Sequence, residues 1–471
     1  MTGPRPAGTG PSTPRRPFSV PRDLLDRYNQ AGPRYTSYPT VPEWSAGFGP
    51  EDTFAALDAN RQQRAGVPLS LYVHVPFCSK LCYYCGCNIH LARDHALVDR
   101  YLAAVDREVG SIAEHVGDQR PVVQLHWGGG TPTHLDPDQI RRLFGSLVRR
   151  FGLARDAEVS IEVHPAVTTP AQLETLAELG FNRISMGVQD FDPEVQQAVH
   201  RIQPFEMTRD LVGLARRLGF ESVNLDLMYG LPHQSPERFV ATLEKTMAIR
   251  PDRIALFNYA HLPAIFPHQR ALKDLPGPEL KLALLETAVD TFLAHGYRYI
   301  GLDHFALPDN ELVRAVADRT LRRNFMGYTT CADSDLLAFG MSAISELAGA
   351  YFQNQRKLFD YLADVESGRL PVVRGMNLSA DDQLRRDVIF ALACLGSVDK
   401  ARVAEHHGIS FDTTFAAELA ALEPMAADGL VALSDDRIEI QPRGQLLVRN
   451  VCMVFDSYLR ATPGRTFSRT I

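Results

Sequence analysis

The chain has 471 residues and a formal net charge of −7, and its 45% hydrophobic and 22% charged residues are typical of a globular protein. This length predicts one large domain of about 200 to 300 residues with at least one smaller one, and no apolar run approaches the about 18 residues that a membrane span needs. The negative balance excludes a general attraction to nucleic acid or to anionic membranes, so an anionic ligand would need arginines placed locally.

The N-terminal residues 1–22 are rich in Pro, Gly and Arg and lack the apolar core of a signal peptide. We therefore expect a disordered tail and a cytoplasmic protein. Cysteine usage agrees, because four of the seven cysteines lie between Cys78 and Cys87 and the other three are scattered singly. An odd number in this pattern is not a disulfide framework and indicates a metal or a cluster in a reducing compartment.

From residue 69 to about 305, short β-branched runs alternate with longer amphipathic helical stretches. Strand, crossover helix and strand at this spacing are typical of a parallel sheet, and six or seven such units favour a full or partial barrel over an open doubly wound sheet. The expected strands are 69–75, 122–128, 157–164, 182–189, 222–230, 253–260 and 297–305.

Functional residues of a barrel collect at the C-terminal ends of its strands. Polar or unusual residues stand at those ends of the predicted strands: Cys78, Gly128 to Thr131, Glu162, Gln189, Asp226 and Tyr259. The segment GGGTPT joins a predicted strand to a helix, where glycines allow the backbone to approach a ligand closely. From the residues alone, Gln189 and Asp226 are also explained as rim salt bridges or caps.

The last region, 376–471, predicts helices at 381–395, 400–407 and 413–429 followed by a hairpin at 430–442. This order resembles a winged helix, which raises DNA binding by an iron–sulfur sensor as an alternative function. Between Arg402 and Arg437 there is no Lys or Arg, while seven Asp or Glu occur there. Such a surface repels phosphate, so we expect a cover or docking element and no nucleic-acid partner.

The cysteine cluster FCSKLCYYCGC allows two metal centres. A structural zinc site usually takes two separated Cys pairs, whereas here all four thiols lie on one loop. C-x3-C-x2-C lets one loop hold three corners of a cubane iron–sulfur cluster and leaves one iron open as a reaction site. We favour the cluster, with Cys78, Cys82 and Cys85 as ligands. Cys87 is then surplus, either facing the reaction chamber or packed as a small hydrophobe.

Several segments together resemble the oxygen-independent coproporphyrinogen III oxidases, a family of radical S-adenosylmethionine enzymes. They are GPRYTSYPT (32–40), LYVHVPFCSKLCYYCGCN (71–88), QLHWGGGTPT (124–133), NRISMGVQDF (182–191), NLDLMYGLP (224–232), FNYAHLP (257–263) and GLDHFALPDNEL (301–312). The resemblance implies an α/β fold: a partial (β/α) barrel of radical S-adenosylmethionine type over 69–375 with a small, mostly helical C-terminal domain. It also implies that segment 23–68 covers the substrate.

The resemblance implies two bound S-adenosylmethionine molecules beside a 4Fe–4S cluster. The first is expected at Tyr72, Gly129, Gly130, Thr131, Glu162 and Ile344, and the second at Tyr84, Gln189, Arg201, Asp226 and Ala260. Tyr72 and Cys87 are the candidate catalytic residues.

The reaction implied is oxidative decarboxylation of two propionates of coproporphyrinogen III to vinyl groups, which gives protoporphyrinogen IX. Breaking an unactivated C–H bond needs a cofactor radical, here 5′-deoxyadenosyl. The substrate carboxylates need arginines, and Arg34 with Arg322 or Arg323 are candidates. We expect a flavodoxin-type electron donor, a monomer and no membrane partner.

Two residues depart from the family pattern: Met326 stands where a Gln is expected, and His164 stands where an Asp is expected. These departures concern individual contacts and not the proposed cluster ligands. The alternative within the superfamily is a haem chaperone without oxidase activity. Such relatives typically lack GPRYTSYPT and carry Phe at the position of Cys87, so both features favour the oxidase.

Overall fold

The computed structural model describes residues 21–92, 94–117, 120–331, 333–461, 467, 469 and 470. The predicted disordered tail at 1–22 lies outside these residues, apart from its last two. Its final residue, Arg22, already begins helix α1 (Arg22–Tyr28).

A single sheet of twelve strands forms the body of the molecule, in the order β16-β15-β14-β13-β1-β4-β5-β6-β7-β8-β10-β9. Strands β1, β4, β5, β6, β7 and β8 are parallel neighbours, and β13 joins β1 in parallel. Within the described residues the end strands β16 and β9 are not paired with each other, so the barrel is partial, as predicted. The strands of the parallel series are β1 (Leu69–Val75), β4 (Val122–Gly129), β5 (Leu153–Val163), β6 (Arg183–Gln189), β7 (Ser222–Tyr229) and β8 (Arg253–Asn258).

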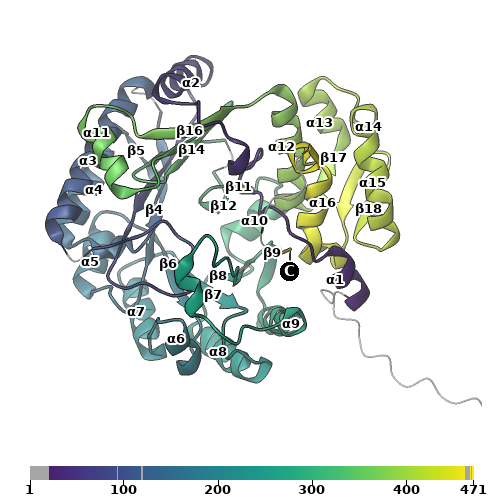
Figure 1. Ribbon diagram of the computed structural model, residues 1–471, viewed down its shortest axis with the longest axis horizontal. Coiled ribbons are helices and arrows are strands. Elements are labelled where there is room, and N and C mark those ends of the chain that lie inside the picture. The colour runs from purple at the N-terminus through teal and green to yellow at the C-terminus, as the bar shows by residue number, and fades with distance from the viewer. Residues whose placement is uncertain are drawn as a thin grey trace, which may run out of the picture.

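Helices cover the outer face of this sheet, as Figure 1 shows for α3 to α8. Most of these helices begin at an N-cap residue with a short polar side chain (Asp, Ser or Thr). Asp136, for example, accepts a hydrogen bond from the Gln139 backbone N–H. The helices of this layer are α2 (Pro50–Gln63), α3 (His95–Val116), α4 (Pro137–Arg150), α5 (Pro170–Glu178), α6 (Pro193–Ala198), α7 (Phe205–Arg217), α8 (Pro236–Ile249), α9 (Pro278–Ala294) and α11 (Leu358–Glu366). The short helix α10 (Glu311–Ala317) lies instead toward the C-terminal helices (Figure 1).

Residues along the parallel strands alternate between the helix layer and the interior of the barrel. Trp127 of β4 is fully buried against Phe181, which follows α5, whereas the neighbouring His126 lines an internal cavity. The same alternation makes Ile161 part of the apolar core and turns Glu162 inward. Apolar side chains therefore hold the helices on the sheet, and polar side chains are left for the barrel interior.

The seventh predicted strand, 297–305, is wrong as a single parallel strand. It divides into β9 (Arg298–Gly301) and β10 (His304–Ala306), which pair antiparallel with each other, and β10 pairs antiparallel with β8. Leu302 between them has a positive φ of 48°, which turns the chain back. The remaining strands of the sheet are β13 (Asp335–Phe339), β14 (Ile344–Leu347), β15 (Ala350–Asn354) and β16 (Val372–Asn377). Two short pairs complete this region: β2 (Phe77–Cys78) with β3 (His90–Leu91), and β11 (Arg322–Asn324) with β12 (Gly327–Thr329).

The C-terminal part is mostly helical and follows the order of a winged helix. Helix α12 is followed by a strand that the sequence reading missed, β17 (Ser397–Asp399), which completes a three-stranded sheet with the predicted hairpin. Its elements are α12 (Ala380–Leu395), α13 (Lys400–His407), α14 (Phe411–Thr414), α15 (Ala416–Ala427), β18 (Val431–Leu433), β19 (Arg437–Ile440), α16 (Val448–Val454) and α17 (Ser457–Ala461). Short 3-10 helices are η1 (Val41–Glu43), η2 (Pro132–His134), η3 (Pro267–Ala271) and η4 (Pro442–Leu447).

The N-terminal segment runs beside the C-terminal helices, where Figure 1 shows α1. The Tyr28 hydroxyl donates to Asp428 at 2.6 Å, and the Tyr35 hydroxyl donates to Asp456 at 3.0 Å. Further along, Ser45 forms an isolated bridge with Gly375 of β16. The segment therefore spans from the C-terminal helices to the edge of the sheet. Among the helices that the structure describes, none combines the length and apolar character needed to cross a membrane.

Candidate active site

The cysteine loop follows β1 directly, at the C-terminal end of the barrel. Cys78 closes the short strand β2, and Cys82, Cys85 and Cys87 lie on the following turn. None of the four forms a disulfide. Cys78, Cys82 and Cys85 are partly buried while Cys87 is exposed, so the fourth thiol stands apart in its exposure. A hydrogen bond from Cys87 lowers the pKa of Cys85 to about 6 and favours its thiolate, the form that binds iron.

Residues distant in sequence fix this loop by hydrogen bonds to its backbone. His268 and Gln269 of η3 bind the carbonyl oxygens of Cys85 at 2.7 Å and Tyr84 at 3.1 Å. On the other side, the His200 ring binds the carbonyl of Leu81 at 2.8 Å. The conformation of the loop is thus held by the barrel and does not depend on the loop alone.

The glycine segment after β4 lies against the base of the cysteine loop. The Gly130 N–H donates to Val75 at 2.8 Å, and Thr131 contacts the Cys78 sulfur through its hydroxyl at 3.5 Å. Gly129 has φ of +113°, and a Cβ atom there would lie 2.5 Å from the His74 ring. The packing therefore requires glycine and lets the backbone of this segment lie directly against the base of the cysteine loop.

Glu162 of β5 turns toward the same glycine segment. Its carboxylate accepts a hydrogen bond from the Gly129 N–H at 3.0 Å and lies 3.5 Å from His126 Nε2. Burial would raise the pKa of Glu162, but His126 and the Gly129 N–H outweigh it and lower the pKa overall. Glu162 is therefore an ionised acceptor next to the glycines, as binding of ribose hydroxyls would need.

Gln189 and Arg201 come together over Gly187 of β6. A Cβ atom at Gly187 would lie 2.9 Å from both Gln189 Nε2 and Arg201 Nη2. Arg201 also lies 3.6 Å from the Cys82 sulfur. The buried atoms Gln189 Oε1 and Arg201 Nε have no hydrogen-bond partner among the described residues, and Gln189 has a positive φ of 68°. Unpaired buried polar atoms of this kind fit a site built for a polar ligand.

Asp226 of β7 is the second carboxyl of the interior and is partly buried. Asn224 donates to it at 2.7 Å and Ser185 at 3.3 Å. Burial and the nearby charge of Glu162 raise the pKa of Asp226 to about 7. The two carboxyls thus differ: one is ionised at neutral pH, and the other titrates there.

The other predicted contacts surround this centre at different distances. Tyr72 stacks on His126 with ring centroids 5.9 Å apart and hydrogen-bonds His74 at 3.1 Å. Tyr84 packs with Tyr259 in a small apolar cluster beneath the cysteine loop. Ala260 follows β8, and Ile344 lies on β14, two strands away from β1 in the sheet.

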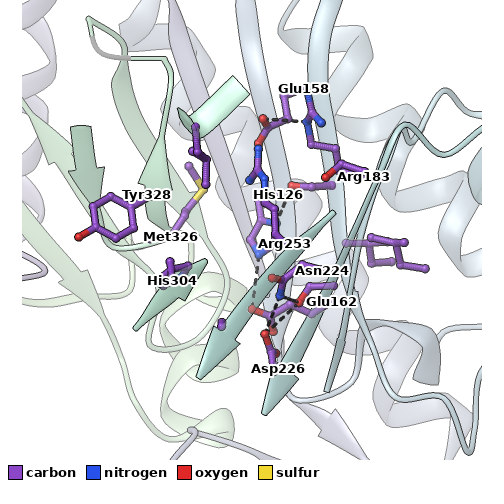
Figure 2. Close-up of a pocket in the computed structure, with 18 of the residues that line it drawn as sticks. His126, Glu158, Glu162, Arg183, Asn224, Asp226, Arg253, His304, Met326 and Tyr328 are labelled. Atoms are coloured by element: carbon purple, nitrogen blue, oxygen red, sulfur yellow. Dashed lines mark hydrogen bonds and ion pairs between the residues drawn. The ribbon is translucent and has the colours of Figure 1, made fainter. Parts of the chain in front are cut away.

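An internal cavity of about 180 Å³ connects these carboxyls to the interior of the barrel (Figure 2). Glu162 and Asp226 lie at one end, and Glu158 paired with Arg183 at 2.9 Å lies at the other. Met326 points into it between His304 and the inner strands. Its thioether cannot form the hydrogen bonds of the Gln amide that the family pattern has at this position. The cavity wall is therefore less polar there than the family pattern predicts.

The candidate substrate arginines fall in two places. Arg34 forms an ion pair with Asp303 at 3.0 Å and lies over the ring of Phe257, which lines the internal cavity. Arg322 and Arg323 instead line a separate cleft of about 720 Å³ that faces the C-terminal helices. Arg323 also reaches the wall of the internal cavity from this cleft, because its guanidinium lies 5.1 Å from the centroid of the Tyr328 ring, which lines that cavity.

His164, the second departure from the family pattern, follows β5 as a partly buried and neutral side chain. Burial lowers its pKa to about 3, and the charge of Arg201 adds to this effect. Its ring accepts a hydrogen bond from the Ala166 N–H at 3.2 Å. An anionic side chain is therefore replaced here by a neutral one beside Arg201.

Sequence reasoning missed His126 and Asn224, which the structure places beside Glu162 and Asp226. The signal was present in the strand period: His126 lies two residues from Gly128 and Asn224 two residues from Asp226, so each pair shares a face. Reading alternation along each strand would have found both.

The residues present fit a cluster and S-adenosylmethionine. Three partly buried thiols on one loop supply a three-thiolate ligand set, and the exposed Cys87 is not needed for it. Gly128, Gly129 and Gly130 form a strip of backbone packed closely against Glu162, His74 and Pro76, since each added Cβ would lie under 3.0 Å from an atom of one of these residues. The unpaired atoms of Gln189 and Arg201 provide further polar contacts.

Comparison with known proteins agrees with this geometry. The profile described as "Radical SAM superfamily" matches residues 72–246, and the "HemN C-terminal domain" profile matches residues 378–447. The oxygen-independent coproporphyrinogen III oxidase of Pseudomonas aeruginosa is 46% identical over 453 residues, covering 95% of this chain and 98% of the relative. The Escherichia coli protein of the same name is 47% identical over 451 residues, with the same coverage. A solved structure of coproporphyrinogen III oxidase from Escherichia coli, described as a radical SAM enzyme, matches with a TM-score of 0.90 at 44% identity and covers 94% of this chain and 100% of that one.

Proposed function

Because this chain belongs to the oxygen-independent coproporphyrinogen III oxidases, we propose that its cysteine loop, glycine segment and internal cavity form one reaction chamber for a tetrapyrrole. Its reaction is the oxidative decarboxylation of two propionate side chains of coproporphyrinogen III to vinyl groups, which gives protoporphyrinogen IX in haem biosynthesis. The main support for a single chamber is that Cys78, Thr131 and Glu162 all lie next to the same glycine segment, Gly128 to Gly130.

In this proposal Cys78, Cys82 and Cys85 hold the 4Fe–4S cluster, and Gly129, Gly130 and Thr131 bind S-adenosylmethionine. When bound, the two cofactors would supply the radical chemistry that cleavage of the unactivated propionate C–H bond requires. The chain's own contribution is to orient the ligands. Glu162 accepts the ribose hydroxyls, and the polar side chains of β5 to β7 that face the interior position the reacting groups.

A second S-adenosylmethionine is proposed beside the first, at Gln189, Arg201 and Asp226 with Tyr84 and Ala260. Its support is the pair of buried polar atoms without partners and the titrating carboxyl of Asp226. Tyr72 and Cys87 remain the candidate catalytic residues, since Tyr72 lies against His126 and Cys87 is the exposed thiol of the loop.

We also propose a cytoplasmic monomer that receives electrons from a flavodoxin-type donor and has no nucleic-acid or membrane partner. Seven unpaired cysteines suit a reducing compartment, and the three proposed cluster ligands are only partly buried, which suits electron transfer from a donor at the surface. The N-terminal segment 23–68 would cover the substrate, because Arg34 reaches the cavity wall from it. The haem chaperone alternative is not favoured, since the relatives at 46% and 47% identity are named oxidases.

An anaerobic assay tests the function. The cluster is reconstituted, then dithionite, S-adenosylmethionine and coproporphyrinogen III are added, and 5′-deoxyadenosine and protoporphyrinogen are followed by chromatography. Both products are expected from the wild type, and neither from Cys82→Ala. Formation of 5′-deoxyadenosine without a vinyl product would contradict the oxidase assignment and favour the chaperone.

A further inference from the structure

We propose that the C-terminal domain contains a binding site for a divalent transition-metal ion, zinc by its ligand set, formed by Asp387, His406 and His407. Asp387 lies on α12, and the two histidines end α13, which packs beside it (Figure 1). The site is distinct from the cysteine loop, because it lines the cleft of about 720 Å³ and not the internal cavity.

The geometry of the three side chains suits a small cation. One ligand atom from each residue lies within 4.8 Å of the other two. Asp387 Oδ2 is 2.9 Å from His407 Nε2 and 3.9 Å from His406 Nε2. Ligands at about 2.0–2.2 Å from a tetrahedral zinc stand about 3.3 Å apart, so only small rotamer changes are needed to close the site.

Local electrostatics favour a cation at this position. The histidines form the last two residues of α13, where the free carbonyl groups of the helix carry a partial negative charge. Gly408 caps the helix in the left-handed conformation, with φ of +64°, and ends it directly behind them. The Asp387 carboxylate adds a full negative charge.

Exposure leaves the ion accessible and keeps one coordination position for water. The His406 side chain is 72% exposed, while His407 is only 13% exposed and is held by Asp387. Two imidazoles and one carboxylate are borderline ligands that suit zinc better than calcium or magnesium. Three protein ligands with water in the fourth position are a known zinc coordination set, in contrast to structural sites, which use four protein ligands.

The nearby charges on the cleft are mixed and do not block the site. Arg386 precedes Asp387, but its guanidinium donates to the Ala348 carbonyl at 3.3 Å, and Glu346 and Tyr351 raise its pKa. Glu405 and Arg402 on α13 also line the cleft and offset one another in charge.

A simple ion pair between His407 and Asp387 would explain two of the three residues. His406 separates the two interpretations, because its Nε2 lies too far from Asp387 for a hydrogen bond yet faces the same oxygen. His406 also packs edge-on against the His407 ring with centroids 4.7 Å apart, which keeps the two imidazoles together, and a shared ion would use both of them. The ion ties the end of α13 to α12 and fixes one wall of the cleft.

Anaerobic calorimetric titration of the holoenzyme with ZnCl₂ tests the site, with iron content measured before and after so that zinc at the cysteine loop is recognised. One zinc per chain is expected with iron unchanged. His406→Ala and His407→Ala should each weaken binding about tenfold or more, as loss of a ligand does. His406 is exposed, so its substitution leaves folding intact. The matched control is His115→Ala, because His115 pairs with Asp58 at 3.0 Å without a third ligand, and its zinc affinity should equal the wild type.

Three results would overturn the proposal. The first is that no zinc binds at concentrations up to about 100 μM. The second is that both His406→Ala and His407→Ala bind zinc with the affinity of the wild type. The third is that the zinc taken up is matched by an equal loss of iron. The thermal unfolding midpoint gives an independent readout, because a ligand bound only to the folded state raises it. Zinc should raise the midpoint of the wild type and of His115→Ala, and it should not raise that of His407→Ala.

Discussion

Glu162 accepts a hydrogen bond from the backbone N–H of Gly129 at 3.0 Å, which connects the third parallel strand, β5, to the last residue of the second, β4. This contact fixes the carboxylate next to the strip where the ribose of S-adenosylmethionine is proposed to bind. It also leaves the second oxygen near His126 and free to accept from a ligand.

Glu162→Gln should raise the dissociation constant of S-adenosylmethionine about tenfold or more, because a hydrogen bond to a charged acceptor contributes about 1.5–3 kcal/mol. The amide oxygen can still accept from Gly129, so folding is preserved. Equilibrium dialysis with labelled S-adenosylmethionine measures the effect. Glu158→Gln, the same change at the opposite end of the cavity, should leave this constant unchanged. Equal effects from both variants would contradict the assignment.

Gly130→Ala should lower the free energy of unfolding by about 1–3 kcal/mol and weaken S-adenosylmethionine binding, because its Cβ would lie 2.7 Å from backbone atoms of Pro76. Backbone cannot move aside as a flexible side chain can. Denaturant unfolding measures the change. Gly152→Ala has open space around the new methyl group and should be neutral or slightly stabilising. A neutral Gly130→Ala would show that the strip is not tightly packed.

Cys87→Ser should keep the iron content of the wild type, whereas Cys85→Ser should lose most of it. The reason is that three partly buried thiols already supply the ligand set and Cys87 is exposed. Iron analysis and the electron paramagnetic resonance spectrum of the reduced protein report the outcome. If Cys87→Ser lost the cluster and Cys85→Ser kept it, Cys87 would be the ligand and Cys85 the surplus thiol, which would contradict the assignment.

Arg34→Ala should raise the KM for coproporphyrinogen III about tenfold while S-adenosylmethionine binding stays unchanged. Arg34 is placed at the cavity wall by Asp303 and Phe257, and a carboxylate–arginine contact contributes about 1.5–3 kcal/mol. Steady-state kinetics separate the two constants. The control is Arg22→Ala, which removes an exposed pair with Glu279 from the same N-terminal segment. A matching rise in KM in this control would indicate a general effect of the segment.

Glu108 predicts a pH dependence of stability away from the reaction chamber. Burial raises its pKa from 4.5 to about 7, although Tyr361, Gly340 and Asn354 donate hydrogen bonds to it. The folded state therefore favours the protonated acid. Its stabilising contribution is complete below pH 4.5 and is lost as pH rises through 7, by at most about 3 kcal/mol. Urea unfolding of wild type and Glu108→Gln at several pH values should show this difference, and parallel curves would contradict it.

Local patterns predicted the parallel strands and the cysteine loop. β1, β4 and β7 follow their β-branched runs closely, because strand period and crossover length are encoded within one segment. The spacing of Cys78, Cys82 and Cys85 needs only one loop, so a cluster could be expected without any tertiary contact. The prediction of one continuous strand over 297–305 was wrong, because a turn at Leu302 reverses the chain within what looks like a continuous strand pattern.

The contacts that assemble the site could not be predicted from the sequence. Arg201 reaches Cys82 across 119 residues, and Glu162 reaches Gly129 across 33. The spacing of residues in the sequence does not predict such contacts. They depend on which strands become neighbours in the sheet and on how far the barrel stays open. The sequence by itself determined which side chains were available and which strand ends carried them. The tertiary structure alone decided which of them meet, because helices packed on the outer face of the sheet force the polar residues of every strand into one interior.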